Sequence, residues 1–450
     1  MAELTFVGAA GTVTGSKHLL ALNGKHVYVD CGMFQGTKET QALNMAPLPV
    51  PAAQTDAIVV THGHIDHVGY LPKIVHDGFR GPIYCTPATS GLIEIVLEDA
   101  AHLQEMMAKR GLEHERARHI PPFYGDDDVQ ATLKLLKTVE LETEFDVCGA
   151  TMRYRNAGHI LGSAFIDARI EGRRVIFSGD VGRYGRPLLY DPEALDAADV
   201  VLCESTYGNR NHPPDALGEL EQALLAGIAR GGPIVIPAFA VERTQDILYS
   251  IGALQKKDPQ IARTPVHVDS PMAIKVDALF ARYPDAHKPF IDTPQQPFGC
   301  SNVTVHVTTD ESKTLNALKG PAIIIASSGM ASGGRILHHL HNHIPDPTAT
   351  IVFVGFQGPG TLGNLMINGA KTVKVFGDPL EVKAAVVSLS GYSAHADQSE
   401  LLRWLGTLKT TPHLYAIHGD PVAATALAAA VQLKLGFTAT VAERGTTVTL

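Results

Sequence analysis

Four potential metal ligands lie within one short stretch of the chain, at His62, His64, Asp66 and His67. Residues 57–61, which precede them, form a short apolar and β-branched run that predicts a buried strand. Imidazole and carboxylate groups suit borderline cations such as zinc. Four such groups are more than one four-coordinate ion usually takes from so short a loop. The stretch therefore predicts a pair of metal ions at the end of a strand; the structural alternative is a polar loop of solvated histidines.

The spacing H-x-H-x-D-H directly after an apolar strand resembles the signature of the metallo-β-lactamase fold. The resemblance implies that His62 and His64 bind one metal, whereas Asp66 and His67 bind the other. Zinc is the expected ion, and manganese or iron remains open because His and Asp ligands suit those metals too. Two such ions can share a water and lower its pKa toward about 7, which gives hydroxide at neutral pH.

Three further metal-type residues stand beside strand-like runs. Asp30 ends the run 26–29, His159 lies in a glycine-flanked turn, and Asp180 directly follows the apolar run 175–177. Taken singly, each would be an ordinary loop residue or a cap on a turn. In this order after H-x-H-x-D-H, however, His159 and Asp180 match the third and fourth metal motifs of the fold. The resemblance implies that His159 completes the first site, that Asp180 bridges both, and that Asp30 orients the metal-binding loop from behind the ligands.

A long insertion, from about residue 208 to residue 375, interrupts this pattern. Its segments 237–245, 327–335 and 355–363 resemble the β-CASP domain of nucleic-acid-processing nucleases. The resemblance covers nearly the whole chain. It is strongest to the bacterial and archaeal relatives of the endonuclease subunit of the eukaryotic pre-mRNA cleavage and polyadenylation complex.

Three single residues support the resemblance to this group of nucleases. Glu204, at the end of a predicted strand, matches the acidic motif A of that family, and His395 and His418 match motifs B and C. A histidine in motif C is typical of the RNA-acting members, whereas the DNA-acting members usually have valine. The resemblance therefore favours RNA as the substrate, and it implies that His418 is a ligand of the second metal.

The resulting hypothesis is a zinc-dependent ribonuclease that cuts single-stranded RNA. Hydroxide would attack phosphorus in line and leave a 5′-phosphate and a 3′-hydroxyl. His395 is the candidate general acid for the leaving O3′, because imidazole titrates near neutrality and Glu204 could hold it protonated. With Asp66, these two residues form the expected catalytic set. The alternatives are a structural histidine at 395 and a turn-capping carboxylate at 204.

Possible RNA contacts lie within the insertion. Ser328 and Gly329 belong to a glycine-rich turn that can expose backbone N–H groups, and Arg335 offers a fork of donors for phosphate. A tight turn that packs between a strand and a helix is the structural alternative. The histidine-rich run 338–343 contains no carboxylate, so it predicts a solvated or RNA-facing helix end rather than a metal site.

Composition restricts the remaining choices. The chain has 450 residues, 45% of them hydrophobic and 18% charged, which is typical of a folded protein with two domains. Neither a membrane span nor a signal peptide is indicated. Five scattered cysteines predict no disulfide framework, so a reducing cytoplasm fits best. The formal charge of −9 argues mildly against a protein that coats nucleic acid. The oligomeric state stays open.

Secondary structure follows from the same patterns. Asn23 and Gly24 predict a hairpin turn between two strands. Helices are expected from residue 70, over residues 89–107 and from residue 126, between strand-like runs. Helices that alternate with strands indicate a layered α/β fold. The expected architecture is a metallo-β-lactamase αββα sandwich with an inserted β-CASP α/β domain; its three segments are residues 1–207, 208–375 and 376–450.

Two other functions remain open. A DNA nuclease or repair factor could use the same scaffold. A non-catalytic RNA-binding partner is the second alternative, although every proposed ligand position is filled. A small-molecule hydrolase fits least, because a large insert would cover the open cleft that such enzymes use.

Overall fold

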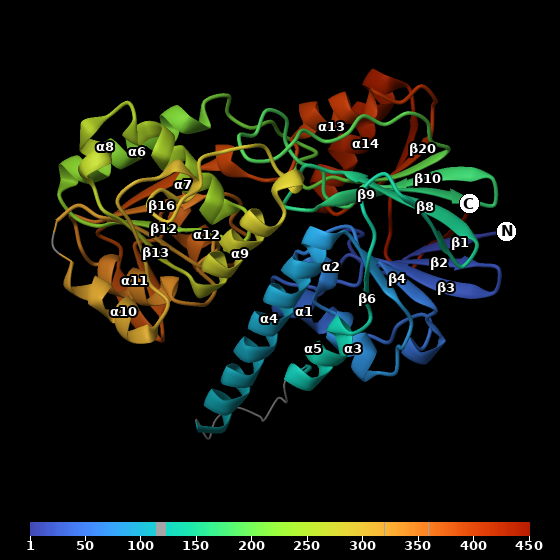
Figure 1. Cartoon of the computed structure of the whole chain (residues 1–450), viewed down its shortest axis with the longest axis horizontal. Helices are drawn as coiled ribbons and strands as arrows, with labels where there is room; N and C mark the ends of the chain where they lie inside the picture. Colours follow the sequence, from blue (N-terminus) through green and yellow to red (C-terminus); the bar gives the residue numbers. More distant parts are fainter. Residues whose placement is uncertain (114–122, 319, 359) are drawn as a thin grey trace. The chain divides into compact units, whose positions relative to one another are not determined.

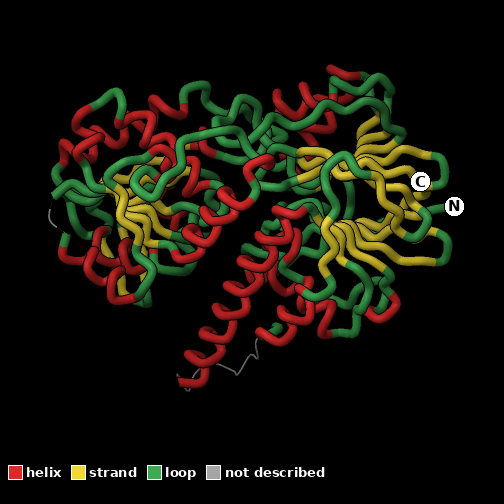
Figure 2. Tube along the Cα trace, viewed as in Figure 1, coloured by secondary structure: helices red, strands yellow, loops and turns green. Residues whose placement is uncertain are grey.

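The computed structural model describes residues 1–113, 123–318, 320–358 and 360–450 (Figures 1 and 2). The chain forms two compact units. The first comprises Met1–Asn211 and His395–Leu450, and the second is His212–Ala394. Within the described residues, no helix is both long and apolar enough to cross a membrane.

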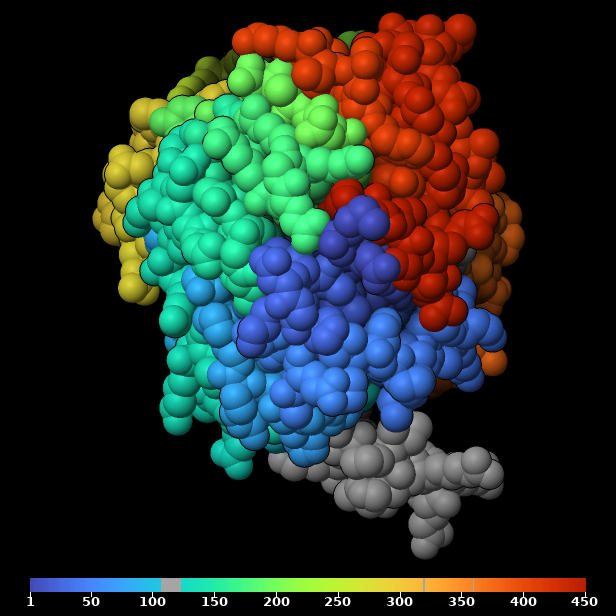
Figure 3. Space-filling view, turned by 90° about the vertical axis from the view of Figure 1, so that its right-hand side faces the viewer, coloured from blue at the N-terminus to red at the C-terminus, as the bar shows by residue number. Residues whose placement is uncertain are grey.

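The first unit begins with a seven-stranded sheet. Its β2–β3 hairpin turns at Asn23 and Gly24, whose φ angles of 51° and 70° suit a two-residue turn, so the predicted hairpin is confirmed. The first and last strands of the chain pair antiparallel in this sheet, and the dark blue start of the chain lies beside its red end in Figure 3. In spatial order, the strands are β22 (Thr447–Thr449), β1 (Glu3–Phe6), β2 (His18–Leu22), β3 (Lys25–Val29), β4 (Ala57–Val59), β5 (Ile83–Cys85) and β6 (Leu136–Thr138).

A second seven-stranded sheet faces the first. Side chains alternate along its strands, so that Phe177 enters the core between the sheets while Ile176 packs under Trp404 on the outer face. In spatial order, the strands are β21 (Thr438–Val441), β20 (His413–Ile417), β11 (Val200–Glu204), β10 (Arg173–Phe177), β9 (Ala164–Ile170), β8 (Ala150–Asn156) and β7 (Glu144–Val147).

Helices cover the outer faces of both sheets, which completes the predicted αββα sandwich. Figure 1 shows α3, α4 and α5 along the first sheet, and α13 and α14 along the second. The three helices that the sequence predicts form as α3, α4 and α5. The helices of this unit are α1 (Lys38–Ala42), α2 (Ile65–Val68), α3 (Leu71–His76), α4 (Pro87–Glu113), α5 (Asp126–Leu133), α13 (Gln398–Leu405) and α14 (Pro421–Leu435).

The second unit is built on a six-stranded sheet whose paired strands are all parallel. Its central strands are apolar throughout, as expected for a parallel sheet covered on both faces. Val235 packs with α11 (Ile336–His343) and α12 (Leu362–Ile367), whereas its neighbour Ile234 lies against α6 (Ala216–Arg230) on the other face. In spatial order, the strands are β14 (Val303–Val305), β13 (Val266–Asp269), β15 (Ile323–Ala326), β12 (Ile234–Pro237), β16 (Thr350–Val354) and β19 (Ala385–Leu389).

The second unit extends further along the chain than residues 208–375. Strand β19 pairs with β16, so the last strand of the parallel sheet ends at Leu389. The boundary between the second unit and the C-terminal part of the first unit falls after Ala394. Strands β17 (Thr372–Val375) and β18 (Asp378–Glu381) form a separate antiparallel pair. The helices of this unit are α6 (Ala216–Arg230), α7 (Arg243–Gln255), α8 (Pro259–Arg263), α9 (Pro271–Arg282), α10 (Thr309–Thr314), α11 (Ile336–His343) and α12 (Leu362–Ile367).

Candidate metal centre

The histidine-rich loop leaves β4 and runs into the short helix α2, within the first unit. Backbone hydrogen bonds tie this helix to the loop after β3: Cys31 N donates to His67 O at 2.8 Å, and Met33 N donates to Ile65 O at 3.1 Å. The two segments approach so closely that a Cβ on Gly32 would lie 1.5 Å from Asp66 O. Backbone hydrogen bonds and close backbone packing therefore fix the position of the histidine-rich loop.

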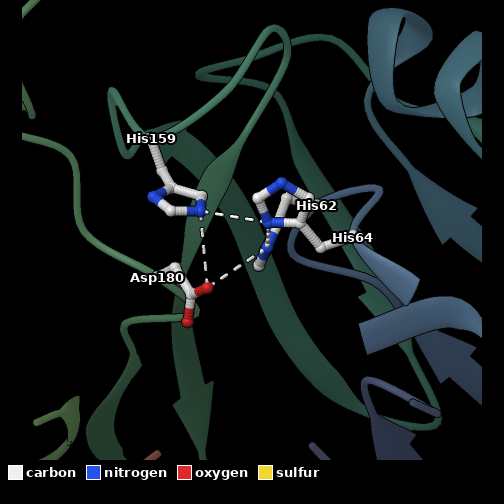
Figure 4. A group of neighbouring side chains, drawn as sticks. All are labelled: His62, His64, His159 and Asp180. Atoms are coloured by element: carbon white, nitrogen blue, oxygen red, sulfur yellow. Dashed lines mark hydrogen bonds and ion pairs between the residues drawn. The ribbon is translucent and has the colours of Figure 1, made fainter. Parts of the chain in front are cut away.

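Four ligand atoms converge in the first cluster, which Figure 4 shows. His64 Nδ1 lies 3.1 Å from His62 Nε2 and 3.1 Å from His159 Nε2. Asp180 Oδ2 lies 3.4 Å from the same atoms of His62 and His159. A tetrahedral zinc with bonds of about 2.0–2.1 Å to nitrogen and oxygen requires ligand atoms about 3.3–3.4 Å apart. The spacing of these atoms therefore fits a four-coordinate cation.

A second cluster adjoins the first through Asp180. His67 Nε2 lies 3.1 Å from His418 Nε2, and His418 Nε2 lies 3.4 Å from Asp66 Oδ2. Asp180 Oδ1 lies 3.4 Å from His67 Nε2, so the two carboxylate oxygens of Asp180 face different clusters. Within the described structure this Oδ1 is buried and accepts no hydrogen bond. Such an oxygen fits a carboxylate that bridges two metals.

Protonation states suit metal binding in the first cluster. Burial lowers the pKa of His62 and His159, and it lowers the pKa of His64 to about 3. These imidazoles are therefore neutral and keep lone pairs for a cation. Burial opposes ionisation of Asp180, but the histidines around it lower its pKa well below the usual range. The cluster thus combines three neutral ligands with one carboxylate.

Asp30 supports the second cluster from behind. Its Oδ2 accepts a hydrogen bond from His67 Nδ1 at 2.7 Å and one from Ser16 Oγ at 3.2 Å, and its Oδ1 accepts from Thr61 N at 2.8 Å. Because Nδ1 of His67 is occupied in this way, Nε2 is the nitrogen that faces His418. The carboxylate thus fixes both the tautomer and the direction of the His67 ring.

Glu204 and His395 form a pair beside Asp180. Glu204 is buried at the end of β11, where Oε1 accepts from Val181 N at 2.8 Å. His395 Nδ1 lies 3.1 Å and 3.2 Å from the two oxygens of Glu204 and 3.8 Å from Asp180 Oδ2. Burial opposes the charged form of His395, but Glu204 and Asp180 outweigh burial and raise its pKa to about 9. The ring is therefore charged and lies against Glu204, and a fifth of its side chain is exposed.

The sequence matches known protein families over most of its length. Family models match three stretches: a beta-lactamase superfamily domain over residues 25–237, a Beta-Casp domain over 244–366, and a Zn-dependent metallo-hydrolase RNA specificity domain over 379–442. Ribonuclease TTHA0252 of Thermus thermophilus is 40% identical over 419 residues, which cover 92% of each chain. The chain belongs to the β-CASP family of the metallo-β-lactamase fold.

Other relatives agree with this membership in the β-CASP family. Transcription termination factor FttA of Methanosarcina mazei is 32% identical and matches 96% of this chain and 69% of its own length. An RNase J-like protein of Methanocaldococcus jannaschii is 29% identical over 93% of both chains. The crystal structure of a protein of unknown function from Enterococcus faecalis shares the fold alone, with a TM-score of 0.57, 12% identity and complete coverage of both chains.

Within the β-CASP unit, the three residues expected to contact RNA lie around the turn that follows β15. Ser328 Oγ lies 3.2 Å from Ser332 Oγ, and a Cβ on Gly329 would meet the Phe239 ring at 2.7 Å. Arg335 Nη1 donates to Asp269 Oδ1 at 2.7 Å, and its Nη2 donates to the carbonyl of Val307 at 2.6 Å. Part of the guanidinium therefore serves the fold of the unit.

The prediction for the histidine-rich run of the β-CASP unit is wrong at two positions. His339 and His343 are buried on the inner face of α11 rather than solvated. His339 Nε2 lies 2.7 Å from Asp269 Oδ2. The run forms the expected helix, but two of its four histidines are buried. Asp269, at the end of strand β13, provides for His339 the carboxylate partner that the run itself lacks.

Sequence reasoning missed several residues that support the metal centre. Thr61 and Ser16 donate to Asp30, Thr206 Oγ1 lies 3.2 Å from His418 Nδ1, and Arg186 Nη1 donates to the carbonyl of His159 at 3.0 Å. Only Thr61 carried a local signal, because it directly precedes the H-x-H-x-D-H motif. The others come from distant segments that the fold brings together.

Proposed function

We propose that this protein is a metal-dependent ribonuclease that hydrolyses phosphodiester bonds of single-stranded RNA and leaves a 5′-phosphate and a 3′-hydroxyl. The observation that carries the proposal is the pair of adjoining ligand clusters that share Asp180, with Glu204 and His395 beside them. The names of the relatives, which include a ribonuclease and an RNase J-like protein, support RNA chemistry.

Two zinc ions are the proposed cofactors, with manganese as the alternative. Bound divalent metals would supply Lewis-acid chemistry, lowering the pKa of the attacking water and offsetting negative charge on the phosphate. The first ion would be held by His62, His64, His159 and Asp180, and the second by Asp66, His67, Asp180 and His418.

His395 is the proposed general acid. Its Nδ1 lies within hydrogen-bond distance of Glu204, and we assign proton donation to the leaving O3′ to Nε2, on the other side of the ring. Glu204 stabilises the imidazolium before transfer and keeps the ring oriented afterwards. Asp66 acts in the same reaction as a ligand that places the second metal, and Asp30 orients His67.

The β-CASP unit would bind the RNA strand. We assign the turn around Ser328 and Gly329 to phosphate contacts, because glycine-rich turns expose backbone N–H groups. Arg335 uses part of its guanidinium on Asp269 and on two carbonyls, so its contribution would be to hold this turn while its remaining donors reach phosphate. A DNA nuclease is the second candidate, since the same metal chemistry cleaves either strand.

Cleavage of a 5′-labelled RNA strand, beside a DNA strand of the same sequence, tests the proposal. Wild-type protein should cut the RNA in a metal-dependent reaction and leave the DNA intact. The double variant D66A/H67A should lose cleavage, and H76A, a change to an exposed histidine of α3, should keep it. Cutting of DNA alone would favour the second candidate, and cutting of neither strand by metal-loaded protein would refute a nuclease.

A further inference from the structure

A small cavity lies behind the second metal cluster, inside the first unit. It measures about 10 Å³, close to the space that one ordered water molecule needs. Its polar walls come from Ser16, His18, Asp30 and Thr61, together with the ligands His67 and His418. All six residues are buried. The cavity is thus a polar space that adjoins two proposed metal ligands.

His18 is the residue that this arrangement leaves unexplained. It opens β2, is 2% exposed, and within the described structure neither of its ring nitrogens has a hydrogen-bond partner. Burial lowers its pKa to about 4, so the ring is neutral and offers one N–H donor and one lone pair. A buried imidazole with two unsatisfied nitrogens destabilises the folded state, unless a water satisfies them.

The neighbours of the cavity can complete the coordination of such a water. The hydroxyls of Ser16 and Thr61 donate to Asp30, so their oxygens and the Asp30 carboxylate are acceptors for a water. The neutral His18 ring adds one donor and one acceptor, and a buried water commonly makes about three hydrogen bonds. Asp30 is also the group that holds His67 Nδ1 at 2.7 Å. A water fixed between His18 and Asp30 would therefore act on the direction of the His67 ring.

A purely structural role for His18 is the competing explanation. Its ring meets Phe6 edge-on, with centroids 6.0 Å apart, so it could serve as an aromatic member of the core. The two explanations differ in what the nitrogens contribute. An aromatic ring without nitrogen would satisfy the packing but could not hold a water.

We propose that His18 is a positioning residue, which holds one buried water against Asp30 and so orients His67 toward the second metal. This inference rests on the proposed metal centre, but its test does not need nuclease activity. Residues that orient a metal ligand from behind typically change metal affinity by 10- to 100-fold when they are replaced.

Zn²⁺ titration against a competing chelator tests the proposal, with full-length H18F, H18Q and wild-type protein. H18F should bind the second zinc about 10- to 100-fold more weakly, while the first zinc binds as in wild type. H18Q, which keeps a polar group able to hold water, should bind both ions within a few-fold of wild type. H413F, which replaces a partly exposed histidine of strand β20, is the matched control and should bind as wild type.

Equal affinity of H18F and wild type for both ions would overturn the proposal and leave His18 as a core residue. If H18F does not fold, H18Q is compared with H18M, which has a similar length and no hydrogen-bonding group. The proposal then requires at least a tenfold difference between them, and equal affinities overturn it. If wild-type protein binds both zinc ions but does not cleave RNA, the nuclease function is overturned, while the comparison of H18F with wild type still tests this inference.

Discussion

At the scale of single residues, the metal centre concentrates negative charge inside the protein. Asp30, Asp180 and Glu204 are almost fully buried, and Asp66 is 17% exposed. The charged ring of His395 offsets one of these four carboxylates, and two divalent cations would offset the others. The separation of roles follows from position: Asp180 lies between the clusters, Asp30 behind one ligand, and Glu204 behind His395.

Replacement of His395 separates proton transfer from metal binding. H395A should keep both metals, because His395 belongs to neither ligand cluster, yet cleave RNA on the order of 10²-fold or more slowly. Single-turnover cleavage measured beside the metal content of the same sample checks this expectation. Cleavage at the wild-type rate would rule out His395 as the general acid, and loss of one metal would make it a ligand instead.

A backbone change should disturb the centre without removing any ligand. In G32A the new Cβ would lie 1.5 Å from Asp66 O, so α2 must move and carry Asp66 and His67 with it. We expect the second metal to be lost, as measured by metal analysis of the purified protein. G333A is the control, because a Cβ there would meet nothing within 4 Å, and its metal content should match wild type.

At the scale of elements, an ion-pair network stabilises the outer face of β8, β9 and β10. Asp167 lies opposite Arg153 in the β8–β9 pairing and accepts hydrogen bonds from Arg174 at 2.6 Å and 2.8 Å. Burial alone would raise the pKa of Asp167, but the hydrogen bonds from Arg174 and then Arg153 outweigh it and lower the pKa. The folded state is therefore stabilised by the ionised form.

The pH dependence of this network has a definite sign. The stabilisation is fully present above the unfolded pKa, which is near 4, and is lost as pH falls through the lowered folded pKa. D167N should reduce the free energy of unfolding by about 1–3 kcal/mol at pH 7, and its difference from wild type should shrink at pH 3. Denaturant unfolding at both pH values measures this, with E144Q on the exposed edge strand β7 as the control. A difference that grows in acid would contradict the account.

A similar network holds the β-CASP unit together around Asp269. This buried carboxylate accepts from Arg335 Nη1 at 2.7 Å and Ser312 Oγ at 2.7 Å, and lies 2.7 Å from His339 Nε2. D269A would leave buried donors unpaired and should destabilise the unit by about 3–5 kcal/mol. Thermal unfolding measures the change. D310A, which removes an exposed partner of Lys313, should leave the transition within a degree or two of wild type.

At the scale of the whole molecule, stability should depend on bound metal. A ligand present at about 1,000 times its dissociation constant stabilises the folded state by about 4 kcal/mol. Removal of metal should therefore lower the melting temperature of the first unit, and D66A/H67A should respond less than wild type. Calorimetry with and without a chelator checks this, and an unchanged melting temperature in wild type would contradict a resident metal pair.

Much of the fold was predictable because its signals are local. The hairpin turn at Asn23 and Gly24, the strand before His62 and the helix from Asp126 each depend on a few neighbouring residues. Resemblance to the family supplied His159 and Asp180, which no local pattern would have joined to the H-x-H-x-D-H motif. The structure brings their side chains into one cluster.

The remainder depends on contacts between distant segments. No periodicity in the run 338–343 reveals that Asp269 lies against its inner face. The place of β19 in the parallel sheet depends on pairing with β16, about 35 residues earlier. The cavity beside His18 exists only because β2, β4 and the segment around His418 meet in space. Such features follow from packing, which sequence patterns specify poorly.

The most direct test of the central claim is metal-dependent cleavage of 5′-labelled single-stranded RNA by the purified protein. We expect products with 5′-phosphate and 3′-hydroxyl ends, no cleavage of the matching DNA strand, and no cleavage by D66A/H67A. Intact RNA in the presence of protein that carries two bound metals would contradict it.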